Sequence, residues 1–304
     1  MNCGKLSLRR RVALEIARKL ENDRVREHRL RQLFWECTLR CNLHCRHCGS
    51  DCKKSSGFVD MPKEDFLRVL DNVAAHTDPH SVFVIISGGE PLMRDDLEEC
   101  GRAIYEKGFP WGMVTNGLYM TPRRFRSLRD AGMHTATVSL DGLEEEHNRM
   151  RGNPKSFARA VDAIRTMAAE PDFVFDVVTC VNRSNYSQLD EVKELLISLG
   201  VKEWRIFTVF PVGRAAQHDD LQLTGEEFRG VMEFIKRTRS EGRIKVSYGC
   251  EGFLGNYEGD VRDHFYTCSA GVSVASVLID GSISACTSIR ADYRQGNIYS
   301  DDFW

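Results

Sequence analysis

The order of apolar and polar residues predicts that buried strands alternate with amphipathic helices. Six short runs are rich in β-branched and aromatic residues, namely 33–38, 81–88, 111–117, 134–142, 173–182 and 203–210. Each run is followed by a stretch with a helical pattern, namely 62–76, 95–108, 121–132, 156–170, 189–200 and 224–242. Strands that alternate with helices in this way form a parallel sheet covered by helices. The pattern therefore predicts an α/β fold.

The segment before the first strand is basic and helical in pattern. Residues 1–31 contain ten Lys or Arg and four Asp or Glu, and Leu8, Val12, Ile16 and Leu20 recur every four residues. This spacing predicts an amphipathic helix. Two interpretations follow: the helix packs on the domain with its basic face in solvent, or it docks an acidic partner or a leader peptide.

The segment after the last helix has a β-rich pattern. Residues 274–289 contain two strand-like runs on either side of Asp280 and Gly281, which is a strong signal for a two-residue hairpin turn. We therefore divide the chain into an N-terminal basic amphipathic helix, an α/β domain and a β-rich C-terminal region, at residues 1–32, 33–242 and 243–304.

Composition narrows the class of protein. The 304 residues are 42% hydrophobic, which suits a packed core, and the net charge of −2 favours neither nucleic acid nor a membrane surface as a partner. The pattern predicts no membrane span and no signal peptide, so we expect a cytoplasmic protein. Eleven cysteines in such a chain are expected to be metal or cluster ligands and buried apolar residues rather than disulfides.

The loop after the first predicted strand carries the densest candidate chemistry. It reads LRCNLHCRHCGS at residues 39–50 and spaces Cys41, Cys45 and Cys48 as C-x3-C-x2-C. Three thiolates can hold three irons of a 4Fe–4S cluster and leave the fourth iron open to a substrate. The alternative is a zinc site that also uses the interleaved histidines His44 and His47.

Further short motifs follow the other predicted strands in a fixed order. They are SGGEPLM at 87–93, TNG at 115–117, SLDG at 139–142, HNRMRG at 147–152 and GRA at 213–215. Together with the cysteine loop, this series resembles the radical S-adenosylmethionine (SAM) superfamily over nearly the whole chain. One position departs from the usual pattern, because His47 stands where an aromatic residue is common.

The resemblance implies a fold and a chemistry. The fold is a partial (β/α)6 TIM-like barrel, and Cys41, Cys45 and Cys48 bind a 4Fe–4S cluster whose open iron is chelated by SAM. The cluster receives an electron from an external donor such as flavodoxin or ferredoxin. Reductive cleavage of SAM then yields a 5′-deoxyadenosyl radical, which abstracts hydrogen from a substrate.

The resemblance also implies SAM-binding residues beyond the cysteines. They are the turn formed by Gly88, Gly89, Glu90 and Pro91, the polar residues Ser139 and Asp141, Arg151 as a partner for the SAM carboxylate, and Asn116. Each of these residues is also an ordinary choice for a turn or a helix cap. No residue is singled out as a catalytic acid or base.

Cysteines in the C-terminal region suggest a second cluster. Cys268, Gly281 and Cys286 are spaced like the opening of a SPASM domain, which carries auxiliary iron–sulfur clusters, and Cys250 is a third candidate ligand. The later SPASM cysteines are absent, so the interpretations are a truncated chain or a shorter twitch-like domain. The alternative is that these cysteines are buried apolar residues.

The sequence is compatible with four functions. The preferred one is a radical SAM enzyme that modifies a peptide or protein, since relatives with a SPASM domain usually do so. The second is a cofactor-biosynthesis enzyme that acts on a tetrapyrrole or another small molecule. The third is a non-catalytic iron–sulfur or zinc protein, and the fourth is an activator that makes a radical site on a partner protein.

Overall fold

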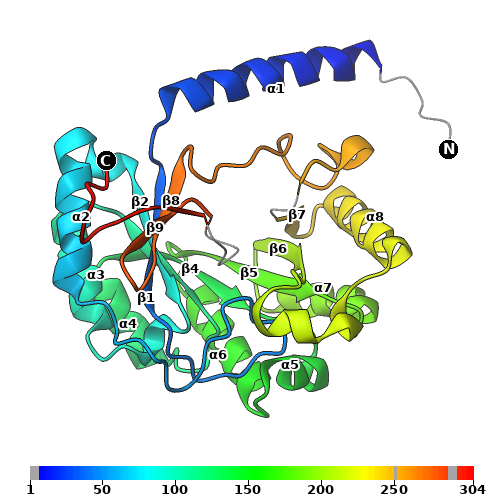
Figure 1. The fold of residues 1–304 in the computed structure, drawn as a ribbon. Helices are drawn as coiled ribbons and strands as arrows, with labels where there is room; N and C mark the ends of the chain where they lie inside the picture. Colours follow the sequence, from blue (N-terminus) through cyan, green and yellow to red (C-terminus); the bar gives the residue numbers. More distant parts are fainter. Residues whose placement is uncertain (1–6, 250–251, 287–292) are drawn as a thin grey trace.

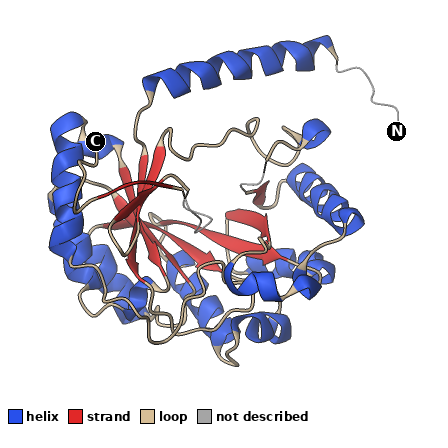
Figure 2. Cartoon of the chain, viewed as in Figure 1, coloured by secondary structure: helices blue, strands red, loops and turns tan. Residues whose placement is uncertain are grey.

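The computed structural model describes residues 7–249, 252–286 and 293–304, and its centre is a curved sheet with helices on the outer face (Figures 1 and 2). The strands are β1 (Gln32–Thr38), β2 (Phe83–Gly88), β3 (Trp111–Thr115), β4 (Met133–Ser139), β5 (Val174–Val181), β6 (Glu203–Thr208), β7 (Lys245–Tyr248), β8 (Val274–Val277), β9 (Ser282–Ser284) and β10 (Arg294–Asn297). The α-helices are α1 (Leu8–Glu27), α2 (Lys63–His76), α3 (Leu97–Glu106), α4 (Pro122–Asp130), α5 (Glu144–Arg151), α6 (Ser156–Ala168), α7 (Leu189–Ser198) and α8 (Gly225–Glu241).

The sheet has the order β10-β9-β8-β1-β2-β3-β4-β5-β6-β7. Each neighbouring pair from β1 to β7 is parallel, and β8 also runs parallel to β1, whereas β9 and β10 are antiparallel additions. The sheet is open rather than closed. The predicted α/β fold, a partial barrel of six strand–helix units, is confirmed, and β7 extends it by one strand that the residue pattern did not indicate.

Apolar residues on the outer face of the sheet pack against the helices. Trp35, Trp111 and Trp204 are almost completely buried, and the ring of Trp35 stacks on Phe66 of α2 with their centroids 4.5 Å apart. Burial of large side chains of this kind supplies most of the favourable free energy of folding. Since side chains alternate across a strand, the residues between these core positions point into the barrel.

The predicted hairpin is present, but its turn is longer than expected. Strands β8 and β9 are antiparallel, and residues 278–281 connect them as a four-residue loop. The loop closes through the Leu278 amide, which donates to the Ser282 carbonyl over 2.9 Å, and Gly281 takes a positive φ of 80°. The hairpin does not stand apart from the barrel, because β8 pairs with β1.

Helix α1 forms as predicted, but its apolar stripe does not pack on the domain. The side chains of Leu8 and Leu20 are 76% and 63% exposed, and the helix contains no buried residue. In Figure 1 it runs past the barrel, in blue at the top of the view. Arg24 near its end donates to the Ser269 hydroxyl and to the Cys268 carbonyl. The packed interpretation is therefore wrong, whereas docking of a partner stays a prediction. In the described ranges, no helix has the length and apolarity needed to cross a membrane.

Candidate functional site

The three predicted cluster ligands meet at the carboxyl end of the barrel strands. The chain leaves β1 at Thr38, and the Cys41 amide then donates to the Lys53 carbonyl over 2.8 Å, which closes the loop. Cys41, Cys45 and Cys48 all carry free thiols and line one cavity of about 350 Å³. The structure thus brings the three thiols to the end of the sheet where parallel barrels place their sites.

The surroundings of the three thiols favour different protonation states. Burial raises the pKa of Cys41 to about 12, and burial also raises the pKa of Cys45 despite the nearby Arg151 guanidinium. The pKa of Cys48 is lowered to about 5, chiefly because the Cys52 thiol donates a hydrogen bond to it. Since a metal binds the thiolate form, metal binding by this loop would release protons from Cys41 and Cys45, whereas Cys48 already favours the thiolate.

The arrangement differs from that of a mononuclear metal site. A zinc site needs ligands that converge on one ion. Within the described residues, no group of three or more His, Cys, Asp or Glu side chains converges in that way. The described residues therefore form no ready-made site for a single ion, and the zinc interpretation stays untested.

The glycine pair after β2 packs directly against the start of the cysteine loop. A Cβ atom on Gly88 would lie 2.2 Å from the Thr38 carbonyl oxygen, and one on Gly89 would lie 2.3 Å from the Arg40 carbonyl oxygen. The Gly89 amide donates to that Thr38 oxygen over 2.7 Å. The close approach explains the need for glycine here. The two glycines hold the cysteine loop and also line the cavity.

Glu90 is buried and accepts hydrogen bonds from three donors of the protein. One carboxylate oxygen accepts from the Thr115 hydroxyl over 2.7 Å and from the Leu92 amide over 3.2 Å. The other accepts from the Asn116 amide over 2.7 Å. Burial raises the pKa of this carboxyl, while the donors oppose that shift. Glu90 therefore ties the turn after β2 to the end of β3.

The residues next to Glu90 have positioning contacts as well. Pro91 begins a short 3-10 helix, η2 (Pro91–Met93), whereas α3 begins only at Leu97. The Asn116 side-chain amide donates to the Asn42 side-chain oxygen over 2.8 Å and lies 3.9 Å from the Cys41 sulfur. Asn116 thus holds the cysteine loop from the end of β3.

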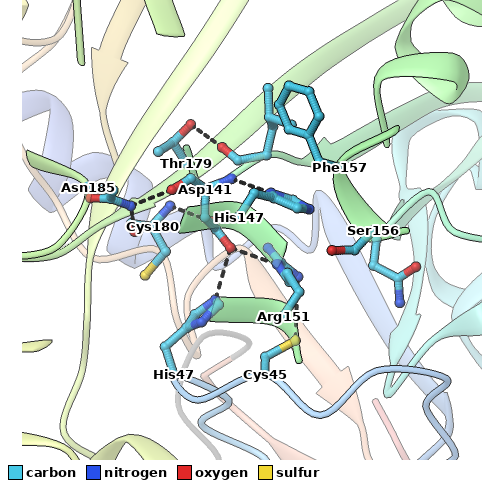
Figure 3. A network of polar contacts seen from close by, with 12 residues as sticks. Cys45, His47, Asp141, His147, Arg151, Ser156, Phe157, Thr179, Cys180 and Asn185 are labelled. Atoms are coloured by element: carbon cyan, nitrogen blue, oxygen red, sulfur yellow. Dashed lines mark hydrogen bonds and ion pairs between the residues drawn. The ribbon is translucent and has the colours of Figure 1, made fainter. Parts of the chain in front are cut away.

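Asp141 and Arg151 form a buried ion pair behind the cysteine loop (Figure 3). The Arg151 Nε donates to an Asp141 carboxylate oxygen over 2.6 Å, and the Cys180 amide donates to the other oxygen over 3.0 Å. One Arg151 Nη atom lies 3.8 Å from the Cys45 sulfur. The guanidinium keeps the Asp141 carboxyl charged and holds its pKa well below the usual range, although burial acts in the opposite direction.

Two histidines complete this network. The His47 Nε2 lies 3.4 Å from an Asp141 carboxylate oxygen, and the Asp141 amide donates to His147 Nδ1 over 3.0 Å. Burial lowers the pKa of His47 to about 4 and that of His147 to about 3. His47, which stands where an aromatic residue is common, is therefore a neutral ring through which the cysteine loop contacts Asp141.

The predicted SAM-contact residues are placed in two ways. Six of them line the cavity with the thiols, namely Gly88, Gly89, Glu90, Asn116, Ser139 and Arg151. Pro91 and Asp141 are not among the lining residues. Contact of any of them with SAM stays a prediction.

Two charged residues of the cavity wall, Glu36 and Arg214, were not predicted as site residues. The Arg214 Nε donates to the Cys45 carbonyl and one Nη donates to the Cys52 carbonyl, each over 2.8 Å. The Glu36 carboxylate accepts from the Ile279 amide over 3.0 Å. Arg214 belongs to the GRA motif. Its contacts are with residues more than 160 positions away in the sequence, so the motif alone did not indicate them. Glu36 is a charged residue within the mostly apolar run of β1, and this contrast is the feature of the sequence that could have indicated a site residue.

The C-terminal cysteines lie in a different part of the barrel. Cys268 is exposed, Cys286 is half-buried, and both line a cavity of about 470 Å³ beside Phe207 and Tyr248. The hairpin thus places Cys286 in the same cavity as Cys268. The prediction for Cys250 lies outside the described residues.

Comparison with known proteins shows which family the chain is similar to. A model of the Radical SAM superfamily matches residues 35–196, which is more than half of the chain. The AdoMet-dependent heme synthase of Methanosarcina barkeri (strain Fusaro / DSM 804) is 30% identical over 221 residues, which are 72% of this chain and 62% of that protein. The chain therefore spans less than two thirds of the heme synthase.

Two further similarities extend into the C-terminal region. Mycofactocin maturase MftC of Mycolicibacterium smegmatis (strain ATCC 700084 / mc(2)155) is 30% identical over 278 residues, or 88% of this chain and 67% of that protein. The structure of Streptococcus suis SuiB bound to S-adenosylmethionine aligns with a TM-score of 0.70 at 16% identity, and covers 98% of this chain and 71% of that one. At this identity the structural likeness shows the fold alone.

Proposed function

The chain belongs to the radical SAM superfamily, and from this membership we propose that it cleaves SAM reductively at a 4Fe–4S cluster held by Cys41, Cys45 and Cys48. The single observation that carries the proposal is that these three free thiols line one cavity together with the glycine turn after β2. Three ligands, rather than four, leave one iron of such a cluster open to SAM.

The residues present fit this cofactor. Besides the thiols, the cavity wall offers the turn at Gly88 and Gly89, the Ser139 hydroxyl and the Arg151 guanidinium. A guanidinium suits the SAM carboxylate, and polar backbone and hydroxyl groups suit its ammonium and ribose. The ion pair with Asp141 leaves Arg151 further donors, since a guanidinium has five.

When bound, the cluster and SAM supply methionine and a 5′-deoxyadenosyl radical, which takes a hydrogen atom from the substrate. The chain's own contribution is to hold the cysteine loop and to line a site in which reactive groups are kept from water. The glycine turn after β2, Asn116 after β3 and Arg214 in the segment that follows β6 hold the loop. The electron comes from an external donor of the flavodoxin or ferredoxin class.

The proposed substrate is a peptide or protein. Support comes from the mycofactocin maturase, whose similarity covers 88% of this chain. A PqqA peptide cyclase of Rhizobium meliloti (strain 1021) is also similar, at 28% identity over 69% of the chain. On this proposal the enzyme acts in the cytoplasm during maturation of a peptide.

A second candidate substrate is a tetrapyrrole. The observation that favours it is the similarity to the heme synthase, at 30% identity over 72% of the chain. The neighbouring genes distinguish the two candidates. A gene for a small precursor peptide would favour the peptide substrate, and genes of a tetrapyrrole pathway would favour the tetrapyrrole.

We also propose that Cys268 and Cys286 bind an auxiliary iron–sulfur cluster in a SPASM- or twitch-like region, with Cys250 as a further ligand. The support is that both described cysteines line one cavity. In the variant Cys268→Ala/Cys286→Ala, iron per chain should fall while the first cluster persists. An unchanged iron content would contradict this assignment.

The test of the main proposal is formation of 5′-deoxyadenosine. Anaerobically reconstituted protein is mixed with SAM and dithionite, beside the variant Cys41→Ala/Cys45→Ala/Cys48→Ala. We expect 5′-deoxyadenosine from the wild type alone. Equal amounts from both proteins, or none from a wild type that has bound iron and SAM, would overturn the proposal.

A further inference from the structure

The inside of the barrel contains a chamber next to the thiol cavity. This chamber has a volume of about 590 Å³ and is lined by the inward-facing residues of β1 to β6. Phe34 lines this chamber, the cavity of the three thiols and the cavity of Cys268 and Cys286. The three spaces therefore adjoin one another around a single side chain.

A charged residue faces this chamber from the middle of β6. Trp204 and Ile206 are fully buried on the outer face of the strand, so the alternation of side chains turns Arg205 and Phe207 inward. Arg205 lines both the chamber and the cavity that reaches Cys268. Interiors of small barrels are usually filled by apolar side chains, so a cation here calls for an explanation.

Neighbouring strands hold the Arg205 side chain in place. Its Nε contacts the Asp176 carboxylate on β5, and one Nη donates to the Thr137 hydroxyl on β4 over 2.9 Å. That hydroxyl in turn donates to the other Asp176 oxygen over 2.6 Å. The register supports this arrangement, because Thr137 pairs with Asp176 across the two strands. One edge of the guanidinium is thus fixed by the protein.

The other edge of the guanidinium is open to the chamber. A guanidinium has five N–H donors, and the contacts to Asp176 and Thr137 use two of them. Within the described part of the chain, the second Nη of Arg205 has no hydrogen bond. The side chain is 42% exposed, whereas that of Asp176 is only 16% exposed. A held and partly exposed guanidinium edge is suited to a bidentate contact with a carboxylate.

The walls around Arg205 are largely aromatic and aliphatic, and the other charged groups of the chamber are Asp176 and Glu203, of which Glu203 pairs with Lys245 over 3.2 Å. Phe34, Phe83 and Phe207 line the chamber, and the Arg205 guanidinium carbon lies 5.9 Å from the centre of the Phe207 ring. A low-dielectric wall strengthens the attraction between the guanidinium and an anion. The chamber therefore combines one directed anion contact with apolar surface for the rest of a ligand.

We propose that Arg205, held by Asp176 and Thr137, is the substrate-binding residue of the barrel and pairs with a carboxylate of the substrate. The proposal rests on the proposed radical SAM function, because it places a substrate group in the chamber next to the thiol cavity. The carboxylate belongs either to an acidic residue of a peptide or to a carboxylate side chain of a tetrapyrrole. In both cases the carboxylate would contact the Arg205 guanidinium in the same way.

The experiment measures binding of two probes to the reconstituted protein in the presence of SAM. The first is coproporphyrin III, followed by its fluorescence and compared with its tetramethyl ester. The second is a fluorescently labelled pentaglutamate peptide, compared with pentaglutamine. Binding of an acid probe, but not of its neutral analogue, identifies the source of the carboxylate.

Two variants test whether binding of the acid probes depends on Arg205. Arg205→Gln removes the cation, and Asp176→Asn/Arg205→Gln removes both charges, so that no unpaired carboxylate destabilises the fold. Arg243→Gln is the matched control, since Arg243 is 49% exposed and also paired with a carboxylate, that of Glu194. We expect about a tenfold or greater loss of acid-probe affinity in both Arg205 variants and none in the control.

The outcomes separate this proposal from the proposed function. Equal affinity in the wild type and the doubly substituted variant, or no acid-selective binding of either probe, would overturn the assignment of Arg205. If binding depends on Arg205 but the wild type forms no 5′-deoxyadenosine, the radical SAM activity fails while the carboxylate site stands. Cooperative thermal unfolding at a temperature close to that of the wild type shows that the variants have folded.

Discussion

The Nε of Arg214 lies 2.8 Å from the carbonyl oxygen of Cys45, across 169 residues of sequence. The same guanidinium donates to the Cys52 carbonyl, so it holds both sides of Cys48. This contact links the cysteine loop to the second half of the barrel, and it makes Arg214 a positioning residue.

Replacement of Arg214 by lysine should loosen the cysteine loop. A lysine keeps the charge but has no fork, so one buried carbonyl loses its donor, at a cost of about 1–3 kcal/mol. We expect a lower unfolding temperature and faster loss of iron during anaerobic desalting. Arg237→Lys is the control, because Arg237 is exposed and paired with Asp190. Iron retention equal to that of the control would contradict the positioning role.

Replacement of Gly89 by alanine should displace the turn from the cysteine loop. The added Cβ would meet the Arg40 carbonyl at 2.3 Å, so the backbone has to move. Such overpacking costs about 1–3 kcal/mol of unfolding free energy. Denaturant unfolding and iron content measure the effect, with Gly57→Ala as the control, since its Cβ would meet nothing within 4 Å. If both variants behave alike, the close approach is not what requires glycine.

Replacement of Glu90 by glutamine should weaken the link between the turn after β2 and the end of β3. The carboxylate accepts from Thr115, Asn116 and Leu92, whereas a side-chain amide turns an NH2 group toward at least one of these donors. We expect the unfolding free energy to fall by about 1–3 kcal/mol. Glu106→Gln, at an exposed position on α3, should change it little. A stability equal to that of Glu106→Gln would argue against the three hydrogen bonds.

His147 should make the fold sensitive to acid. Its pKa is about 3 in the folded protein, below the ordinary value of 6.5, because burial disfavours the charged ring. In the unfolded chain His147 therefore becomes protonated below pH 6.5, whereas in the folded chain it stays neutral until the pH falls to about 3. Stability from this group is present above pH 6.5 and is lost as the pH falls toward 3.

The variant His147→Gln isolates this effect. Between pH 7.5 and 5.5, the wild type should lose about 1.4 kcal/mol more unfolding free energy than the variant. Urea unfolding at several pH values under anaerobic conditions measures the difference. His80→Gln serves as the control, since the His80 side chain is 80% exposed. Parallel pH profiles for the wild type and His147→Gln would show that His147 titrates normally.

Much of the barrel was predictable from local patterns. Runs such as 81–88 and 173–182 form strands β2 and β5, because short runs of β-branched residues bounded by turn residues favour a strand. The C-x3-C-x2-C loop follows β1 directly, so it had to lie at the carboxyl end of a parallel sheet. The apolar stripe of α1 predicted its helix but not whether anything covers it.

The partners of the buried polar groups could not be predicted in this way. Glu90 accepts from the end of β3, Arg214 holds the cysteine loop, and Arg205 lies beside Asp176 inside the barrel. Residue patterns decide which segments become strands and helices, because these preferences act within about ten neighbouring residues. Only the packed fold decides which distant polar groups meet, because that depends on strand order and register across the whole sheet.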